Sequence, residues 1–390
     1  MASPQRQIPV PPDNRRDFTT SDFRGVNTQA KRYEIEQGQQ AWLENVMPIG
    51  DGNGKIVPGP SANLLAAALG EIPYYAQNFN ISGHDYLFVA TQSGNLYQIG
   101  PLDTGTYTKT LVDTAGNGAG KFTACQCAQW QNTSIVIVDG VNGYYDWTGG
   151  VLTKGTTYAP VGARPAFSTG QAIATFSGRV WVASGRTIYF SNTVGNVVAG
   201  SSGLSYNDWT SAGGGTGGSF TLTDETLHSN VTQLLAANNF LYIFGQDSAN
   251  VISDVQVVGG VTVFTNTNLS TGVGTSFPDA IVTYYRTIWF SNPSGFFGLH
   301  GTTAKKGSDD LDGVYQLFNG MTSTPPAIGA APTVTAGLVT IYNILCLAFL
   351  VSYADPVAGT RPLLCVYFDG KWFFCSQGAN TGAGALTLIA

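Results

Sequence analysis

The chain has 390 residues, enough for one large domain or several ordinary ones. Hydrophobic residues make up 43% and charged residues only 11%, so the chain can bury a large core and does not have the composition of a disordered protein. The 49 glycines show no three-residue period, which excludes a collagen-like chain. The formal net charge of −6 leaves no broad basic surface for tight nucleic-acid binding.

The charge is unevenly distributed, because six of the 18 Lys and Arg residues lie within the first 32 positions. Residues 1–20 contain Pro9, Pro11 and Pro12 and no apolar signal-peptide core, so we expect an extended N-terminal arm there. A basic arm on a mildly acidic body suits docking to an acidic partner, and a solvated terminus is the alternative. Residues 21–75 are expected to form a separate unit of short strands and loops that helps to close the structure, and residues 76–390 the main domain.

The main domain repeats one pattern, in which a short apolar strand, a polar or glycine-rich turn and a second strand follow one another. The apolar residues that lead these hairpins are spaced by 49, 45, 61, 47 and 56 positions. They are Tyr86, Ile135, Val180, Leu241, Ile288 and Ile344. A hairpin in every unit of about 50 residues is the signature of a β-propeller. We therefore predict an all-β fold, a β-propeller of about six blades, with a two-sheet sandwich as the alternative.

Two further features bear on the fold. The hexapeptides at 187–192 (TIYFSN) and 287–292 (TIWFSN) resemble each other, and convergence on good strand residues explains them as well as common origin does. The apolar run at residues 337–354 approaches the length of a membrane-spanning helix. Because strand-forming residues dominate it and Asn343 interrupts it, we predict two buried strands with a turn near Asn343, and no membrane span.

The sequence has few features that are typical of catalytic or metal-binding sites. The three histidines have no ligand spacing, and the five cysteines are too few and too scattered for a disulfide framework, so we predict free thiols on apolar strands. The glycine runs at 50–55 and 213–218 lack phosphate-loop spacing and are interpreted as turns or loops. Asp309, Asp310 and Asp312 could bind a divalent ion, although an exposed acidic loop is the preferred interpretation. We predict no enzyme activity, no catalytic residues, no metal and no cofactor.

Carbohydrate chemistry is the alternative that the sequence leaves open. Propellers can host glycosidases, which need two carboxylates about 5–9.5 Å apart, but no sialidase-type repeat or nucleophile elbow is present. Aromatic side chains at Tyr144, Tyr145 and Trp147 could stack on sugars, although filling of the blade is the preferred interpretation.

Several segments carry a resemblance to a known family. They are residues 22–28 (DFRGVNT), 42–47 (WLENVM), 178–192 (GRVWVASGRTIYFSN), 236–253 (AANNFLYIFGQDSANVIS) and 364–377 (LCVYFDGKWFFCSQ). Together they resemble the tail-hub or nozzle proteins of short-tailed bacteriophages. The likeness spans residues 21–390, and the chain departs from the pattern where it stops at Leu386–Ala390, because further strands are expected there. That strand is expected to pair with the N-terminal unit.

The resemblance implies a structural virion protein of the phage tail, assembled in the host cytoplasm. It would be a homo-oligomer, expected as a hexamer, below the portal and adaptor ring, with tail fibres or a needle as further partners and DNA passing only in transit. A carbohydrate-binding or hydrolytic propeller, such as a tail spike or receptor-binding protein, is the alternative function. The residues expected to contact a partner, starting from the basic bias of the N-terminal segment, are Arg15, Arg16, Phe23, Arg24, Lys31 and Arg32.

Overall fold

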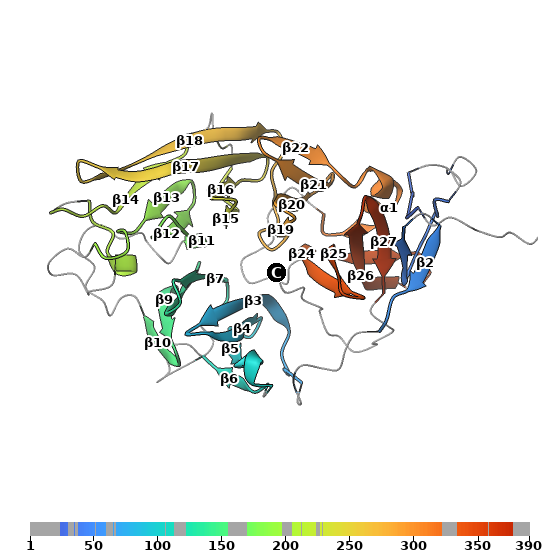
Figure 1. The fold of residues 1–390 in the computed structure, drawn as a ribbon, viewed down its shortest axis with the longest axis horizontal. Helices are drawn as coiled ribbons and strands as arrows, with labels where there is room; N and C mark the ends of the chain where they lie inside the picture. Colours follow the sequence, from blue (N-terminus) through green and yellow to red (C-terminus); the bar gives the residue numbers. More distant parts are fainter. Residues whose placement is uncertain are drawn as a thin grey trace, which may run out of the picture.

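The computed structural model describes most of the chain. The described residues are 24–29, 35, 38–50, 52–59, 65, 68–105, 107–112, 122–154, 170–196, 205–211, 213–223, 227, 229–321, 334–357 and 359–376. Six antiparallel sheets succeed one another along the chain and surround a common centre (Figure 1). The prediction of an all-β, six-bladed β-propeller is confirmed.

Each of the first five blades is a four-stranded meander in which neighbours in sequence are neighbours in the sheet. The strands of blades one to three are β3 (Pro73–Ile81), β4 (His84–Thr91), β5 (Leu96–Ile99), β6 (Lys109–Leu111), β7 (Cys125–Trp130), β8 (Ser134–Asp139), β9 (Gly143–Thr148), β10 (Val151–Lys154), β11 (Gly170–Phe176), β12 (Arg179–Ser184), β13 (Thr187–Phe190) and β14 (Gly218–Thr221). Those of blades four and five are β15 (Gln233–Ala237), β16 (Phe240–Phe244), β17 (Ser248–Val258), β18 (Val261–Thr271), β19 (Ile281–Tyr284), β20 (Thr287–Asn292), β21 (Gly295–His300) and β22 (Thr303–Lys306).

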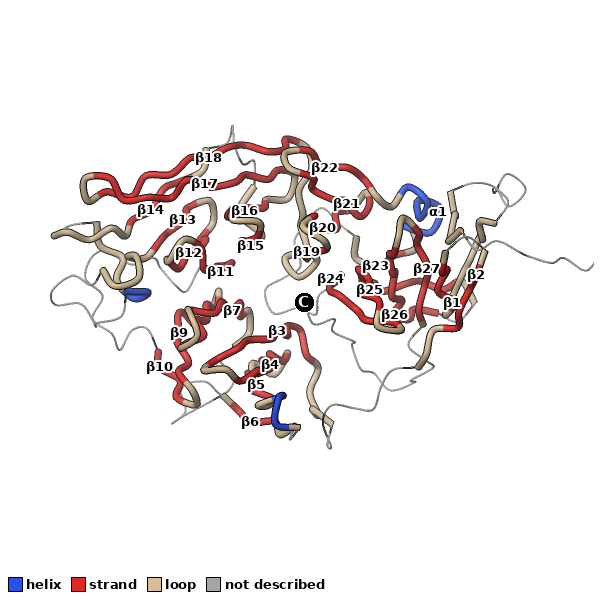
Figure 2. Tube along the Cα trace, in the orientation of Figure 1, coloured by secondary structure: helices blue, strands red, loops and turns tan. Residues whose placement is uncertain are grey.

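Blade six has five strands, because the two-residue β23 and the longer β24 both pair with β25. Its strands are β23 (Phe318–Asn319), β24 (Val334–Ile341), β25 (Ile344–Asp355), β26 (Gly359–Phe368) and β27 (Lys371–Cys375). In the described residues, helical structure is confined to short turns: η1 (Leu102–Thr104), η3 (Ser205–Asn207), η4 (Asp309–Leu311) and α1 (Asp312–Tyr315). Figure 2 shows how small this helical share is beside the strands.

The apolar run at residues 337–354 forms strands, as predicted. It spans most of β24 and β25, and Ile341 pairs with Ile344 across the turn. Tyr342 and Asn343 occupy this turn with φ of 52° and 62°, the left-handed pair that a tight two-residue hairpin requires. Among the described residues, no helix is both long enough and apolar enough to span a membrane.

The core consists mainly of apolar layers between neighbouring blades. Each layer takes large side chains from two facing sheets: Phe88 of blade one meets Trp147 of blade two with ring centroids 5.1 Å apart, and Phe244 of blade four meets Phe290 of blade five at 5.4 Å. Such rings fill the gaps that widen away from the axis. A blade cannot bury both of its faces alone, so these layers hold the six sheets together.

The N-terminal unit packs against blade six. Its hairpin is β1 (Val46–Ile49) with β2 (Asn53–Ile56), and Met47 is fully buried in the layer that blades five and six share. Just before β1, Glu44 forms a parallel bridge with Phe374 of β27, and the Asn45 N–H donates to the Phe374 carbonyl at 2.7 Å. The chain therefore lies along the edge strand of blade six before it enters blade one at Pro73. Residues 1–20 and Leu386–Ala390 lie outside the described residues.

Candidate functional site

Two hollows are lined by residues in the described part of the propeller. The first, which we call the hairpin groove, has a volume of about 660 Å³, within the usual range for ligand sites. It lies where the tip of the β17–β18 hairpin reaches over blade three (Figure 1). Its lining residues are Phe190, Trp209, Thr210, Ser211, Gly215, Thr216, Gly217, Gly218, Ser219, Phe220, Gly260, Val261, Thr262 and Phe264.

Aromatic rings form one wall of the hairpin groove. The ring of Phe264 on β18 lies 4.9 Å from that of Phe220 on β14 and 5.9 Å from that of Phe190 on β13. Phe190 and Trp209 are buried, whereas Phe220 and Phe264 are only half-buried. The latter two rings therefore keep accessible surface on the groove side.

Polar contacts hold a second wall, the loop at residues 213–218, in place. The Asn192 Oδ1 accepts hydrogen bonds from the Gly217 N–H at 2.8 Å and from the Thr216 hydroxyl at 2.9 Å. The Thr262 hydroxyl donates to the Thr216 carbonyl at 2.5 Å, which ties the hairpin tip to this loop. A Cβ at Gly217 would lie 2.7 Å from the Trp209 carbonyl carbon, so only glycine lets the loop pack this closely. The run at 213–218 is a loop leading into β14, as interpreted, but its place in the groove was not predicted.

A buried cation lies behind this wall. Arg179 is 1% exposed, and its Nη1 donates to the carbonyls of Ser191 at 2.7 Å and Thr216 at 2.8 Å. Its Nε and Nη2 have no hydrogen-bond partner, and burial lowers the pKa of the guanidinium to about 10. No carboxylate pairs with it among the described residues, and Arg179 is not part of the groove lining.

The second hollow, which we call the axial cavity, lies where the innermost strands of the blades meet and has a volume of about 140 Å³. Every blade contributes to its lining. The residues are Tyr74, Tyr75, Ala76, Gln77, Gln126, Cys127, Ile173, Gln233, Leu234, Leu235, Pro278, Asp279, Ile281, Thr335 and Ala336.

Three of these polar side chains form a hydrogen-bonded chain across the axis. The Gln233 Nε2 of blade four donates to the Gln126 Oε1 of blade two at 3.1 Å, and the Gln126 Nε2 donates to the Asp279 Oδ1 at 3.4 Å. Asp279 precedes β19, and its own carbonyl accepts from the Ala336 N–H of blade six at 2.9 Å. Burial raises the pKa of Asp279 to about 6, although the hydrogen bond from Gln126 by itself lowers this pKa.

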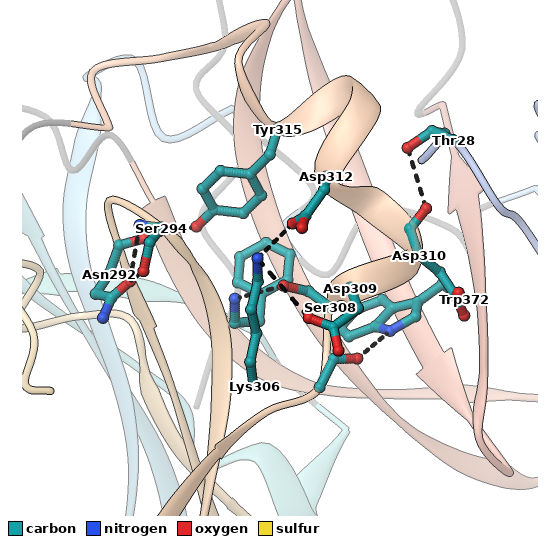
Figure 3. Close-up of polar contacts among 12 residues, drawn as sticks. Thr28, Asn292, Ser294, Lys306, Ser308, Asp309, Asp310, Asp312, Tyr315 and Trp372 are labelled. Atoms are coloured by element: carbon teal, nitrogen blue, oxygen red, sulfur yellow. Dashed lines mark hydrogen bonds and ion pairs between the residues drawn. The ribbon is translucent and has the colours of Figure 1, made fainter. Parts of the chain in front are cut away.

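The acidic cluster at 309–312 is occupied by a lysine. Figure 3 shows Lys306 reaching between Asp309 and Asp312, with its Nζ 3.8 Å from Asp309 Oδ1 and 2.5 Å from Asp312 Oδ1. The Asp310 carbonyl accepts from the Thr28 N–H at 2.7 Å and from its hydroxyl at 3.0 Å. The ammonium thus lies where a metal ion would lie, and no group of three metal-ligating side chains occurs in the described part of the chain. This cluster joins blade five to the N-terminal segment.

Of the residues expected to contact a partner, only Arg24 lies in the described part of the chain. It is exposed, and its backbone N–H donates to the Gly38 carbonyl at 2.8 Å. Arg15, Arg16, Phe23, Lys31 and Arg32 lie outside the described residues.

The aromatic residues considered for sugar stacking are core residues. Tyr144, Tyr145 and Trp147 are each at most 2% exposed, which agrees with the interpretation that they fill the blade.

Both hollows escaped the sequence analysis. A signal for the axial cavity was present, since glutamines recur on the innermost strands β3, β7 and β15, but those strands were not identified. A signal for the hairpin groove was the absence of any charged residue between Asp254 and Asp279. That segment forms the outer part of the β17–β18 hairpin, of which only the first strand was predicted.

Comparisons with known proteins show where similar folds occur. No protein-family model and no curated protein matches the chain. Among solved structures, it is similar to the extracellular domain of a hybrid two-component system from B. thetaiotaomicron, with a TM-score of 0.46 and 10% identity over 84% of this chain and 36% of that one. It is also similar to the same kind of domain from a second hybrid two-component system of that organism, with a TM-score of 0.41 and 10% identity over 82% and 43%. This chain spans less than half the length of those structures.

The prediction of a phage tail hub or nozzle is corrected by this comparison. The similar structures named here are extracellular domains of bacterial regulatory systems, and neither is a virion protein. The physical reason for the error is that the quoted segments are hairpins. Residues 178–192, for example, are strand formers around a glycine turn in β12 and β13, which any propeller can use.

Proposed function

We propose that this chain is a non-catalytic binding module, a β-propeller that holds a neutral carbohydrate chain in the hairpin groove. The observation that carries the proposal is the lining of that groove, which combines accessible aromatic rings with hydroxyl and main-chain groups and, among the described residues, contains no ionisable side chain. Ligand sites in proteins combine apolar walls with a few fixed polar groups in this way.

The aromatic wall suits the apolar faces of sugar rings. Phe220 and Phe264 are half-buried, with their planes tilted by 49° to each other, so they offer two differently oriented surfaces for stacking. Val261, 64% exposed at the hairpin tip, extends the apolar surface. Ser211 and Ser219 are exposed on the rim, where their hydroxyls can exchange hydrogen bonds with sugar hydroxyls.

The neutral lining favours binding over cleavage and a neutral ligand over a charged one. Glycoside hydrolysis needs two carboxylates on either side of the scissile bond, and the lining offers none. Phosphate backbones are bound by surface Lys and Arg, which the lining also lacks.

The groove is largely formed before a ligand arrives. Asn192 fixes the loop at Thr216 and Gly217, and Thr262 fixes the hairpin to that loop. A rigid site loses less conformational entropy on binding, so weak stacking and hydroxyl contacts suffice for measurable affinity.

The test uses a bulky side chain to fill the groove. Ser219→Trp places an indole on an exposed residue of β14 inside the lining, whereas Thr221→Trp places one two residues further on the same strand and outside it. The full chain and both variants are applied to an array of neutral and acidic glycans. We expect the chain and Thr221→Trp to bind neutral glycans alike, and Ser219→Trp to lose at least about tenfold in affinity, the equivalent of 1.4 kcal/mol.

The proposal fails if no neutral glycan binds, or if both tryptophan variants bind as the unmodified chain does. Catalysis is checked on the same glycans by following reducing ends, and turnover would contradict the non-catalytic assignment. Self-association into a hexamer stays a prediction, which native mass measurement of the purified chain addresses.

A further inference from the structure

The axial cavity has features of a second, chemically different site. We infer that it binds a small organic cation, a primary alkylammonium, with the Asp279 carboxylate as counter-ion. This inference is independent of the hairpin groove, since the two hollows share no lining residue.

The charge of the cavity favours a cation. Among the described residues of the lining, Asp279 is the only carboxylate, and there is no Lys, Arg or His. The other ionisable groups that face the cavity are Tyr74, Tyr75 and the thiol of Cys127, and burial raises the pKa values of both tyrosines far above the usual range, so they stay neutral. Once ionised, Asp279 therefore has no compensating charge among the described residues of the lining, which is costly unless a cation binds.

The cavity has a surplus of hydrogen-bond acceptors. In the described part of the chain, the Asp279 carboxylate accepts one hydrogen bond, the 3.4 Å contact from Gln126, although a carboxylate has about four acceptor positions. Thr335 lines the cavity and is only 4% exposed. Its buried hydroxyl has no hydrogen-bond partner among the described residues. A buried hydroxyl is normally paired, so Thr335 indicates a missing partner. The half-buried Asp279 carboxylate, which borders the same cavity, has acceptor positions for the same ligand.

The size and the lining of the cavity favour an alkylammonium over other cations. A monovalent cation balances one carboxylate, whereas a divalent one would leave a buried positive charge, and calcium usually takes 6–8 oxygen ligands, often from several carboxylates. The volume of about 140 Å³ far exceeds the roughly 10–15 Å³ that one water requires. Ile173, Leu235 and Ile281 supply an apolar part of the wall, which an alkyl group would contact. An ammonium has three N–H donors for the acceptors on the other side.

Isothermal titration of the full chain with propylammonium chloride tests the inference. The buffer is phosphate at about pH 8, where Asp279 is ionised, because Tris is itself a primary amine. Tetramethylammonium chloride, which has the same charge but no N–H donor, and potassium chloride are the matched controls. We expect saturable binding of propylammonium with one site per chain and at least about tenfold weaker binding of both controls, since neither control can donate a hydrogen bond to the charged carboxylate.

Three variants locate the site. Asp279→Asn keeps the shape of the side chain and removes its charge, and we expect at least about tenfold weaker binding. Thr335→Val removes the unpaired hydroxyl, and a loss of a few-fold is expected. Asp254→Asn changes an exposed carboxylate on the β17–β18 hairpin and is expected to bind as the unmodified chain does.

The pH dependence gives a second readout. Binding to the unmodified chain should weaken as the pH falls from about 8 to about 5, because protonation removes the charge of Asp279. The same pH change should leave the residual binding of Asp279→Asn unaltered. The inference is overturned if propylammonium does not bind at about pH 8, which would indicate a water-filled cavity, or if Asp279→Asn binds as tightly as the unmodified chain.

Discussion

Arg361 of β26 binds the carboxylate of Glu44 through two parallel hydrogen bonds, Nη1 to Oε1 at 2.9 Å and Nη2 to Oε2 at 3.1 Å. Its Nε donates to the Asp355 Oδ2 of β25 at 3.0 Å, so one guanidinium joins two carboxylates. Glu44 precedes β1, and Arg361 lies near the other end of the chain. This pair therefore fastens the N-terminal unit, which leads into blade one, to blade six.

Replacing Glu44 by Gln should destabilise the propeller by about 1–2 kcal/mol near neutral pH, because a two-point, partly buried pair is stronger than an ordinary surface ion pair. Burial alone would raise the pKa of Glu44, but hydrogen bonds from Arg361 and its neighbours lower it below 4.5. The contribution is therefore fully present above the unfolded-state pKa of about 4.5 and is lost as the pH falls through the lower folded-state value. Urea unfolding of both proteins across this pH range measures it.

The matched control for Glu44 is Asp103, which pairs with His84 at 2.9 Å on the exposed surface. Asp103→Asn should leave the urea midpoint almost unchanged near neutral pH. Equal effects of Glu44→Gln and Asp103→Asn would show that the Glu44–Arg361 pair has no special role in closing the ring.

Replacing Asp279 by Asn should stabilise the protein at about pH 8 in an amine-free buffer. Because burial raises the folded-state pKa of this carboxyl from 3.8 to about 6, the native state loses stability as the pH rises from 3.8 to about 6. Asparagine avoids that loss, and we expect it to raise the unfolding free energy by about 1–2 kcal/mol at pH 8. This gain is smaller than the full pKa shift would give, because the carboxyl borders a cavity. The gain should vanish below the unfolded-state pKa. The explanation would be contradicted if the variant and the unmodified chain differed in unfolding free energy by the same amount at pH 4 and at pH 8.

Replacing Gly313 by Ala should loosen the N-terminal segment. Gly313 lies in α1, and a Cβ there would lie 1.8 Å from the Thr28 carbonyl oxygen. This contact is too close to persist, so residues 24–29 should move away and the Thr28 hydrogen bonds to Asp310 should break. We expect a loss of about 1–3 kcal/mol and faster amide hydrogen exchange in that segment.

Gly59→Ala is the control for Gly313, since no atom lies within 4 Å of the Cβ position there. Its unfolding free energy and the hydrogen exchange of residues 24–29 should match those of the unmodified chain. Unaltered exchange in Gly313→Ala would mean that the N-terminal segment does not depend on its contact with α1.

The five cysteines should be unreactive in the folded protein. All five are free and buried, and burial raises the pKa of Cys346 to about 11 and that of Cys375 to about 12, so the thiolate forms are rare at neutral pH. An aromatic disulfide reagent should therefore detect no thiol in the native protein at about pH 8 and five thiols after unfolding. Rapid reaction of one or more thiols in the native state would show local opening of a blade.

The prediction from sequence worked best where neighbouring residues determine the structure. Alternating apolar residues and turn residues identified the middle hairpin of every blade, and the turn at Asn343 was placed within one residue. The two similar hexapeptides also occupy the positions that their neighbouring turns predict. Residues 187–190 form β13, the second strand of its hairpin, whereas residues 287–292 form β20, the first strand of its hairpin. The hexapeptide itself favours only a strand, and the turn beside it decides which strand it becomes.

The amino-acid sequence by itself determined that the chain folds into repeated hairpins, because strand preference and turn chemistry act over a few residues. Only the tertiary structure decided that Gln126, Gln233 and Asp279 meet at one axis, and that the β17–β18 hairpin covers Phe220 of another blade. These contacts join blades that are far apart in the chain. They depend on how the sheets twist and pack around the axis, which no local pattern of residues specifies.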